Sequence, residues 1–293
     1  MMAVRVLQYS DVENAYDRPE RIGRLPGLVG ERRDEDTLVV GTGDTTAPGV
    51  LSLVSEGRQA LAFFERVAPD LETFGNHDFD HGTGSILGIV TDSPQTWVAT
   101  NVYRPDTDPP DRIDDRADRF GADAGVVPTA IREIDGTRLG FVGVLDPATP
   151  DVTPTAADLV VTDPVEATRR ATTRLRARGV DAVIVLSHVG RGDAELARRT
   201  DVDVVLGGHV HSLRLERIDG TVLTRPGSNA RRVIELRFDA GEWTAAAHDV
   251  PDAPVDEGVA DALRGRLSAA GLDEVVATAP SPIERSDATV AGA

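Results

Sequence analysis

Residues 74–82, FGNHDFDHG, place two histidines and two aspartates within a short segment of a chain that has only six histidines. Imidazole and carboxylate groups transfer protons, and they also bind divalent metal ions. A turn that happens to be polar explains the same residues equally well. The choice between a turn and a site therefore depends on whether similar residues occur at related positions elsewhere.

Polar residues of the same kinds follow five apolar segments that we predict to be strands. They are Asp11 and Glu13 after VRVLQY, Asp44 after TLVVGT, Asn76, His77 and Asp78 after LETF, His188 after AVIVL, and His209 and His211 after DVVL. In a mainly parallel sheet, ligands bind beyond the carboxyl ends of the strands. A turn accounts for any one of these positions, but five strand ends of this kind indicate a binding site.

The donor types restrict the chemistry of this site. The chain has no cysteine, which excludes disulfides and thiolate metal sites. Oxygen and imidazole donors suit Mn, Fe, Zn, Co or Mg. Two such ions, about 3.5–4 Å apart, can hold a phosphoryl group and activate a hydroxide. Glycines beside the polar residues allow turns that a Cβ atom would forbid.

The elements that position these residues alternate between apolar strands and helices. We predict strands at residues 4–9, 37–42, 71–74, 97–102, 130–134, 138–144, 182–186 and 202–206, and helices at 58–67, 164–178, 194–199 and 255–270. Short β-branched runs indicate the strands, and apolar residues at helical spacing indicate the helices. Residues 103–125 predict a loop, and 213–250 predict strands joined by turns. This order is typical of an α/β fold with a mainly parallel sheet and a later antiparallel portion.

The motifs in this order, GD, GNHD, SH and GHVH, resemble those of the calcineurin-like metallophosphoesterase superfamily. Within it, GNHDFDHG is similar to the GNHEFD-type signature of 5′-nucleotidases and 2′,3′-cyclic phosphodiesterases. PGSNARRVIELRF, residues 226–238, resembles the closing strands of that branch. The resemblance covers residues 4–238. It implies an α/β sandwich of two mixed β-sheets flanked by helices, and dinuclear-metal-dependent hydrolysis of phosphate esters, with nucleotides as the expected substrates.

The resemblance also implies a role for each residue. The first metal would take Asp11, Asp44 and His211, and the second would take Asp44, Asn76, His188 and His209, with Asp44 bridging. His77 would act on the substrate beside Asn76, and Asp78 would orient it. Arg191 is an outside candidate for a substrate phosphate. We expect His81 to be a loop histidine, the alternative being a hydrogen bond behind the site, and His248 to be structural or exposed.

Two features depart from the family pattern. Glu13 stands where the family has a histidine, so it either takes over as an oxygen ligand or points away and weakens the first site. An oxygen-rich site favours Mn or Mg over Zn, and we expect Mn. The domain prediction is a catalytic domain at 1–250, a helix and connector at 251–278, and a flexible tail at 279–293. That tail resembles the start of a nucleotidase C-terminal domain, which is not seen here.

Charge gives the remaining expectations. The formal net charge is -18, with 49 acidic residues, and all 31 basic residues are arginine. Acidic excess spread along a chain is tolerated best where salt screens it, which favours a haloarchaeal, halophilic protein. The first residues do not have the pattern of a signal peptide, so a cytoplasmic protein is expected. With no basic stripe, a nucleic-acid partner is not expected, and with no apolar run near the roughly 20 residues of a membrane span, neither is a membrane. A nuclease of the same superfamily, or a weakened metal-binding module with a regulatory role, remains an alternative to the small-molecule phosphoesterase.

Overall fold

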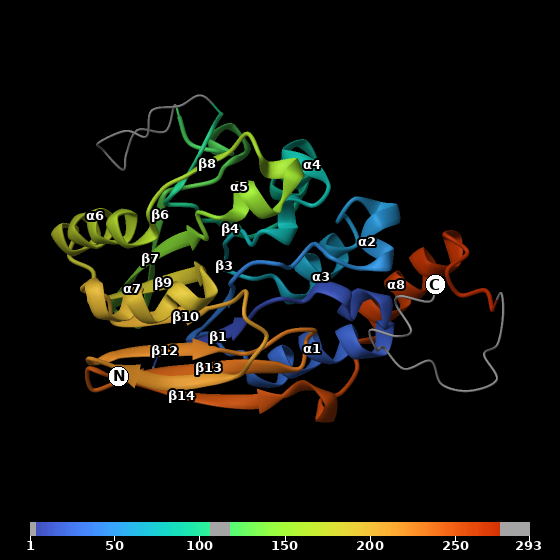
Figure 1. The fold of residues 1–293 in the computed structure, drawn as a ribbon. Helices are drawn as coiled ribbons and strands as arrows, with labels where there is room; N and C mark the ends of the chain where they lie inside the picture. Colours follow the sequence, from blue (N-terminus) through green and yellow to red (C-terminus); the bar gives the residue numbers. More distant parts are fainter. Residues whose placement is uncertain (1–3, 106–117, 276–293) are drawn as a thin grey trace, which may run out of the picture.

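The computed structural model describes residues 4–105 and 118–275, and two six-stranded mixed sheets form its centre (Figure 1). The first sheet has the order β14 (Glu242–Asp249), β13 (Arg232–Asp239), β1 (Val4–Tyr9), β2 (Thr37–Gly41), β3 (Leu71–Glu72) and β4 (Thr96–Trp97). The second has the order β11 (Arg214–Ile218), β12 (Thr221–Arg225), β10 (Val204–Gly207), β9 (Ala182–His188), β7 (Thr137–Leu145) and β6 (Thr129–Ile134). The sandwich of two mixed sheets flanked by helices is confirmed.

Successive side chains of a strand point to opposite faces of its sheet. One face can therefore pack against the other sheet while the opposite face packs against helices. In β1, Val4 and Val6 join the apolar cluster between the sheets. Leu7 and Tyr9 point the other way, into a cluster with helices. The helices of that cluster include α1 (Pro19–Arg32), α3 (Ala60–Val67) and α8 (Glu257–Ala269). The second sheet is covered by α6 (Pro164–Ala177) and α7 (Asp193–Arg199), on the other side of the sandwich (Figure 1).

The direction of the strands decides where the site lies. In the first sheet β1, β2, β3 and β4 run parallel, and in the second β7, β9, β10 and β12 do so. Register aligns their ends, with Tyr9 opposite Gly41 and Gly207 opposite Ser187. The loops that leave these ends carry the polar residues singled out by the sequence.

Four α-helices of the described residues were not predicted: α1, α2 (Val50–Ser55), α4 (Gly82–Asp92) and the short α5 (Thr149–Val152). Helix α1 contains Pro26 and three glycines, so its intrinsic helix propensity is low. Its packing explains one of them, because a Cβ on Gly27 would lie 2.0 Å from the carbonyl oxygen of Pro254. The chain therefore uses small residues to bring α1 against the segment before α8.

Several predicted elements have different lengths in the structure. The strand expected at 71–74 is the two-residue β3, and that expected at 97–102 divides into β4 and β5 (Val102–Tyr103). β5 pairs with β8 (Val160–Val161) as a separate ribbon. Residues 106–117 of the predicted loop, and 276–293 at the end, lie outside the described residues. Among the described residues, no helix is both long and apolar enough to cross a membrane.

Candidate metal centre

Loops from both sheets bring two groups of metal-type donors together. Asp44, His188 and His209 form one group, and Asp11, Glu13 and His211 form the other; within each group the donor atoms lie within 4.8 Å of one another. Asn76 joins the first group, with its Oδ1 2.9 Å from His209 Nδ1. All seven residues predicted as ligands are therefore in one region.

His188 shows most directly that the first group suits a cation. Its Nδ1 lies 2.7 Å from the carbonyl oxygen of Thr42, so Nδ1–H donates and Nε2 is left to face Asp44. Nε2 is buried, has no hydrogen-bond partner in the described part of the chain, and lies 3.0 Å from Asp44 Oδ2. An imidazole nitrogen and a carboxylate oxygen this close together share a cation, which is either a proton or a metal ion. A divalent ion fits both atoms.

His188 and Asp44 strongly shift each other's pKa values. Although burial opposes it, Asp44 raises the pKa of His188 to about 10. Burial also works against ionised Asp44, yet His188 holds the pKa of Asp44 below its ordinary value. For His209, burial lowers the pKa and His188 adds to this, while Asp44 and Asp146 oppose it. A divalent ion bound to both groups would take the place of the proton that His188 holds beside Asp44.

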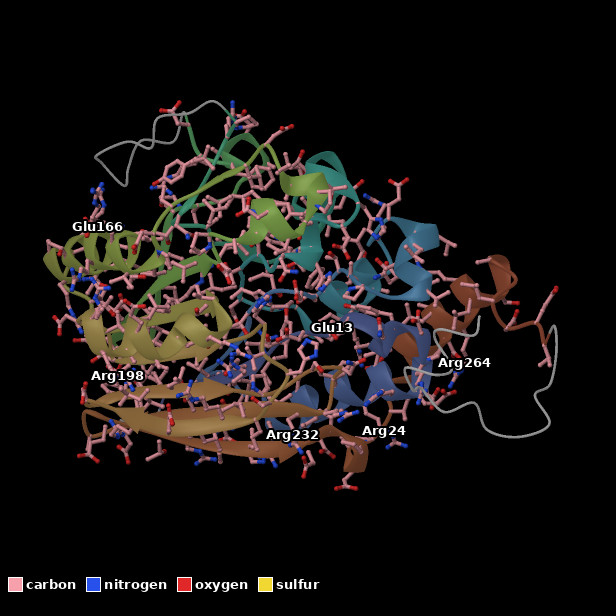
Figure 2. All side chains as sticks on the ribbon, in the orientation of Figure 1. Glu13, Arg24, Glu166, Arg198, Arg232 and Arg264 are labelled. Carbon is pink, nitrogen blue, oxygen red and sulfur yellow. The ribbon has the colours of Figure 1, made fainter. Side chains whose placement is uncertain are left out.

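Glu13 is directed into the second group rather than away from it. Its Oε1 lies 2.8 Å from His211 Nε2, and Asp11 Oδ1 lies 3.7 Å from the same nitrogen. Figure 2 shows Glu13 in the interior, away from the peripheral arginines that it labels, and the residue is only 3% exposed. Burial raises the pKa values of Asp11 and Glu13 to about 7. A cation bound beside these two carboxyl groups would favour their ionised forms.

Four of these residues have an unusual backbone conformation, which sets the direction of their side chains. The φ angle is 48° at Asp11, 49° at Glu13, 53° at Asp44 and 68° at His209, in the left-handed region that residues with a Cβ rarely adopt. Such conformations persist only where surrounding contacts hold them. Here the backbone N–H of His209 donates to Asp11 Oδ1 at 3.0 Å, which fastens a loop of one sheet to a loop of the other.

Close packing of the loops explains two glycines in the motifs. A Cβ on Gly75 would lie 2.1 Å from Asp44 Oδ1, and one on Gly208 would lie 2.8 Å from His188 Nδ1. Neither position has room for a side chain, because a buried ligand group already fills it. These glycines let the backbone approach the metal-type donors, as the sequence motifs indicated.

Asp78 has a different role from the predicted one. Its carboxylate accepts hydrogen bonds at 2.8–3.0 Å from the backbone N–H groups of Asp44, Thr45, Thr46 and Gly75. Asp78 therefore joins the loops after β2 and β3, and it does not orient His77. The prediction was wrong because the short 3-10 turn His77–Phe79 directs the Asp78 side chain toward the interior.

Asp80 is the residue that positions His77. Its Oδ2 lies 2.9 Å from His77 Nδ1, and this hydrogen bond raises the pKa of His77 to about 9. The backbone N–H of His77 donates to Asp44 Oδ1 at 2.8 Å, which fixes the imidazole beside the ligands. The second ring nitrogen has no partner among the described residues. His77 is thus a partly exposed imidazolium with one N–H free for a substrate.

The other singled-out residues lie farther from these contacts. Arg191 is exposed and does not line the cavity beside His77. His81 Nε2 lies 2.8 Å from Ser52 Oγ, so it makes a hydrogen bond next to Asp80 instead of projecting as a plain loop residue. His248 lies on the outer strand β14, and its Nε2 is 2.9 Å from Glu235 Oε2, which agrees with a structural role.

Sequence reasoning missed three residues at the site. Asp80 was overlooked because Asp78 is nearer to the motif histidine. Asn229 Nδ2 donates to Glu13 Oε2 at 3.1 Å, from a loop more than two hundred positions away. Asp146 directly follows β7, so the rule that found the other residues, a polar residue after an apolar strand, would also have found it.

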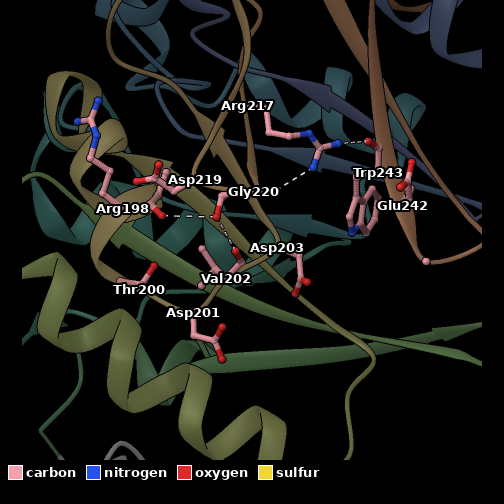
Figure 3. A pocket seen from close by; sticks show the side chains of 13 residues that line it. Arg198, Thr200, Asp201, Val202, Asp203, Arg217, Asp219, Gly220, Glu242 and Trp243 are labelled. Atoms are coloured by element: carbon pink, nitrogen blue, oxygen red, sulfur yellow. Dashed lines mark hydrogen bonds between the residues drawn. The ribbon is translucent and has the colours of Figure 1, made fainter.

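A cavity of about 340 Å³ adjoins the cluster and is lined by Asn76, His77, Asp146, Ala148, Thr149, Val152 and His209. A larger cavity, of about 580 Å³, lies elsewhere (Figure 3). It is lined by Asp203, which directly precedes β10, and by Gly220 and Gly241, which lie in turns between strands. It therefore lies at the opposite end of β10 from His209, and none of the predicted site residues lines it.

Comparison with known proteins agrees with this geometry. Residues 4–213 match the family described as Calcineurin-like phosphoesterase. The Apyrase of Anopheles gambiae is 24% identical over 193 residues, which are 65% of this chain and 32% of that protein. The Probable 5′-nucleotidase of Treponema pallidum (strain Nichols) is 28% identical over 201 residues, 66% of this chain and 32% of that protein.

Solved structures show the same fold. The structure of a 5′-nucleotidase precursor from Thermus thermophilus aligns with a TM-score of 0.78 and 21% identity, over 94% of this chain and 61% of that one. The chain spans about a third of the length of the curated relatives it matches. Because the family match covers residues 4–213, well over half of the chain, this protein belongs to the calcineurin-like phosphoesterase family.

Proposed function

We propose that this chain is a dinuclear-metal phosphoesterase that hydrolyses phosphate esters of nucleotides, as a phosphomonoesterase or a cyclic phosphodiesterase. The observation that carries the proposal is the buried Nε2 of His188 facing the Asp44 carboxylate, beside a second donor group. The names of the relatives, apyrase and 5′-nucleotidase, support nucleotides as the substrate class.

In this proposal, Asp44, Asn76, His188 and His209 would hold one divalent ion, and Asp11, Glu13 and His211, together with Asp44, would hold the other. When bound, the two ions would neutralise the charge of the phosphate and acidify a water molecule. With Glu13 present, the second group has two carboxylates and a single imidazole. Hard oxygen donors of this kind favour Mn or Mg over Zn.

The residues of the chain supply the remaining steps. His77 carries a proton that the Asp80 carboxylate helps to retain, and it would donate this proton to the oxygen of the leaving alcohol. Asp78 holds the loops of Asp44 and Asn76 at a fixed separation through its hydrogen bonds to backbone N–H groups. That separation positions the phosphoryl group between the ligands and the imidazole.

The amino-acid composition supports a proposal about the organism and the compartment of the protein. A net charge of -18 without any lysine supports a halophilic, haloarchaeal origin and a salt-rich cytoplasm. The same charge supports a small-molecule substrate over nucleic acid, because a chain with a net charge of -18 repels a phosphate backbone.

The test is hydrolysis by metal-depleted protein to which Mn, Zn, Mg, Co or Fe is returned in molar KCl. An aryl phosphate, AMP and a cyclic nucleotide are the substrates. We expect metal-dependent turnover, with Asp44→Asn losing at least about 100-fold because a ligand is removed. Asp201→Asn, which makes the same charge change at an exposed residue, is the control. A protein that binds two ions but hydrolyses none of these esters would be a metal-binding module instead.

A further inference from the structure

A carboxylate outside the two donor groups also faces the site. In the second sheet, Leu145 at the end of β7 lies opposite His188, and the backbone N–H of Asp146 donates to the carbonyl of His188 at 3.1 Å. Asp146 thus reaches the same sheet edge as the ligands. It lines the 340 Å³ cavity together with His77, Asn76 and His209.

The Asp146 carboxylate has bonding capacity left for a ligand. Its Oδ1 accepts from the backbone N–H of Ala148 at 2.9 Å, whereas Oδ2 has no partner among the described residues. Next to it, the Thr149 side chain lines the same cavity, and its hydroxyl is buried with no hydrogen-bond partner in the described chain. A buried polar atom left without a partner commonly marks a ligand or water position.

The charge of the cavity limits what it can hold. Its lining residues include a carboxylate and two histidines, and none of them is an arginine. A volume of about 340 Å³ lies at the small end of the range for small-molecule sites. His77, the imidazolium of this cavity, serves the leaving oxygen in the proposed reaction. The part of a substrate that contacts Asp146 Oδ2 itself must therefore be compact and a hydrogen-bond donor or a cation, since an anionic group at that oxygen would be repelled.

We propose that the wall formed by Asp146 and Thr149 is the subsite for the alcohol part of the substrate, and that it selects esters with a single phosphate. A hydroxyl group of a sugar or similar polyol donates to Asp146 Oδ2, whereas a second phosphate is repelled by this carboxylate. This inference rests on the proposed phosphoesterase function. It narrows the substrate class to nucleoside monophosphates and comparable sugar phosphates, and it disfavours di- and triphosphates.

The experiment compares kcat/KM for AMP, ADP and ATP in the wild type, Asp146→Asn and Asp151→Asn. Asp151, in the short helix α5 (Thr149–Val152), is exposed and does not line the cavity, so its variant controls for net charge. Assays use the lowest KCl concentration that preserves the fold, because salt screens the repulsion. We expect the wild type to favour AMP over ADP by about 10-fold or more, a ratio that Asp146→Asn reduces by about 10-fold through better use of ADP.

Thr149→Val provides a second arm that preserves side-chain shape. It should raise KM for AMP by about 3- to 10-fold, with little change in kcat, because one hydrogen bond to the substrate is lost. Asp151→Asn should leave both the ratio and KM unchanged.

Equal efficiency of the wild type toward AMP and ADP, or an unchanged ratio in Asp146→Asn, would overturn the inference. An unchanged KM in Thr149→Val would remove Thr149 from the subsite. Failure of the proposed function looks different, because the wild type would then hydrolyse no ester at all, including an aryl phosphate, with two metal ions bound.

Discussion

His77 combines a hydrogen bond to Asp80 with a backbone contact to Asp44, so its imidazolium is both charged and positioned. We predict that His77→Asn lowers kcat by about 10²–10⁴-fold, the usual contribution of a general acid. Metal content should stay at the wild-type value, since His77 is not among the donor groups. Turnover and metal analysis on the same preparation test this.

The partner of His77 can be tested separately. Asp80→Asn should reduce kcat by about 10- to 100-fold, as loss of an orienting hydrogen bond commonly does. Loss of one metal equivalent from His77→Asn would show that the imidazole is a ligand and would contradict the assignment.

Glu13 is the residue where this chain departs from the family pattern, and its carboxylate contacts His211. We predict that Glu13→Ala weakens binding of one metal ion by about 10- to 100-fold, because a buried oxygen donor is removed. Glu13→His should shift metal preference toward Zn or Co. Metal titration measures both effects, with exposed Glu31→Ala as control. Equal stoichiometry and affinity in the wild type and Glu13→Ala would show that Glu13 does not bind the ion.

At the scale of elements, a buried carboxyl links the strands that lead to the site. Glu72 of β3 accepts hydrogen bonds from the Tyr9 hydroxyl of β1 and from the backbone N–H of Gly43, at 3.3 Å, after β2. Its oxygens fill the space where a Cβ on Gly41 would lie. Burial raises the pKa of Glu72 to about 8. The folded protein therefore retains a proton that the unfolded chain releases near pH 4.5.

This proton makes stability depend on pH. The contribution of Glu72 is fully present below about pH 4.5 and is lost as pH rises toward about 8. We predict that Glu72→Gln, which keeps the shape, removes this dependence. Between pH 5 and 8, the wild-type free energy of unfolding should fall more steeply, by at most about 1.4 kcal/mol per pH unit. Urea unfolding at several pH values measures the slopes, and identical slopes would show that Glu72 is ionised in the fold.

At the scale of the whole molecule, the acidic charge is spread over the chain and is only partly paired. Arg264, for example, contacts Glu20, Glu257 and Asp261 on exposed surfaces, an arrangement that contributes little by itself. The remaining repulsion should diminish when salt is added. We predict that the thermal midpoint rises steeply from low salt to molar KCl. Scanning calorimetry measures the rise, and sucrose at matched osmolality separates screening from solute exclusion. A flat profile would remove the halophile proposal.

The sequence alone determined the strands and the residues at their ends. β1 was predicted with its observed bounds, because a short β-branched run between polar residues suits a buried strand and little else. Residues such as Asp11, Asp44 and His188 follow directly from that, since parallel strands deliver their ends to one edge of a sheet. Local information was sufficient here because at most three residues separate each ligand from the end of its strand.

Only the tertiary structure decided which side chains meet. Asp80, just after the 3-10 turn His77–Phe79, contacts His77 in the position that the sequence suggested for Asp78. Asn229 reaches Glu13 from the loop between β12 and β13, and α1 forms through packing despite Pro26. These features depend on contacts between segments far apart in the chain. Such contacts exist only after the two sheets have packed, so periodicity and spacing carry no signal for them.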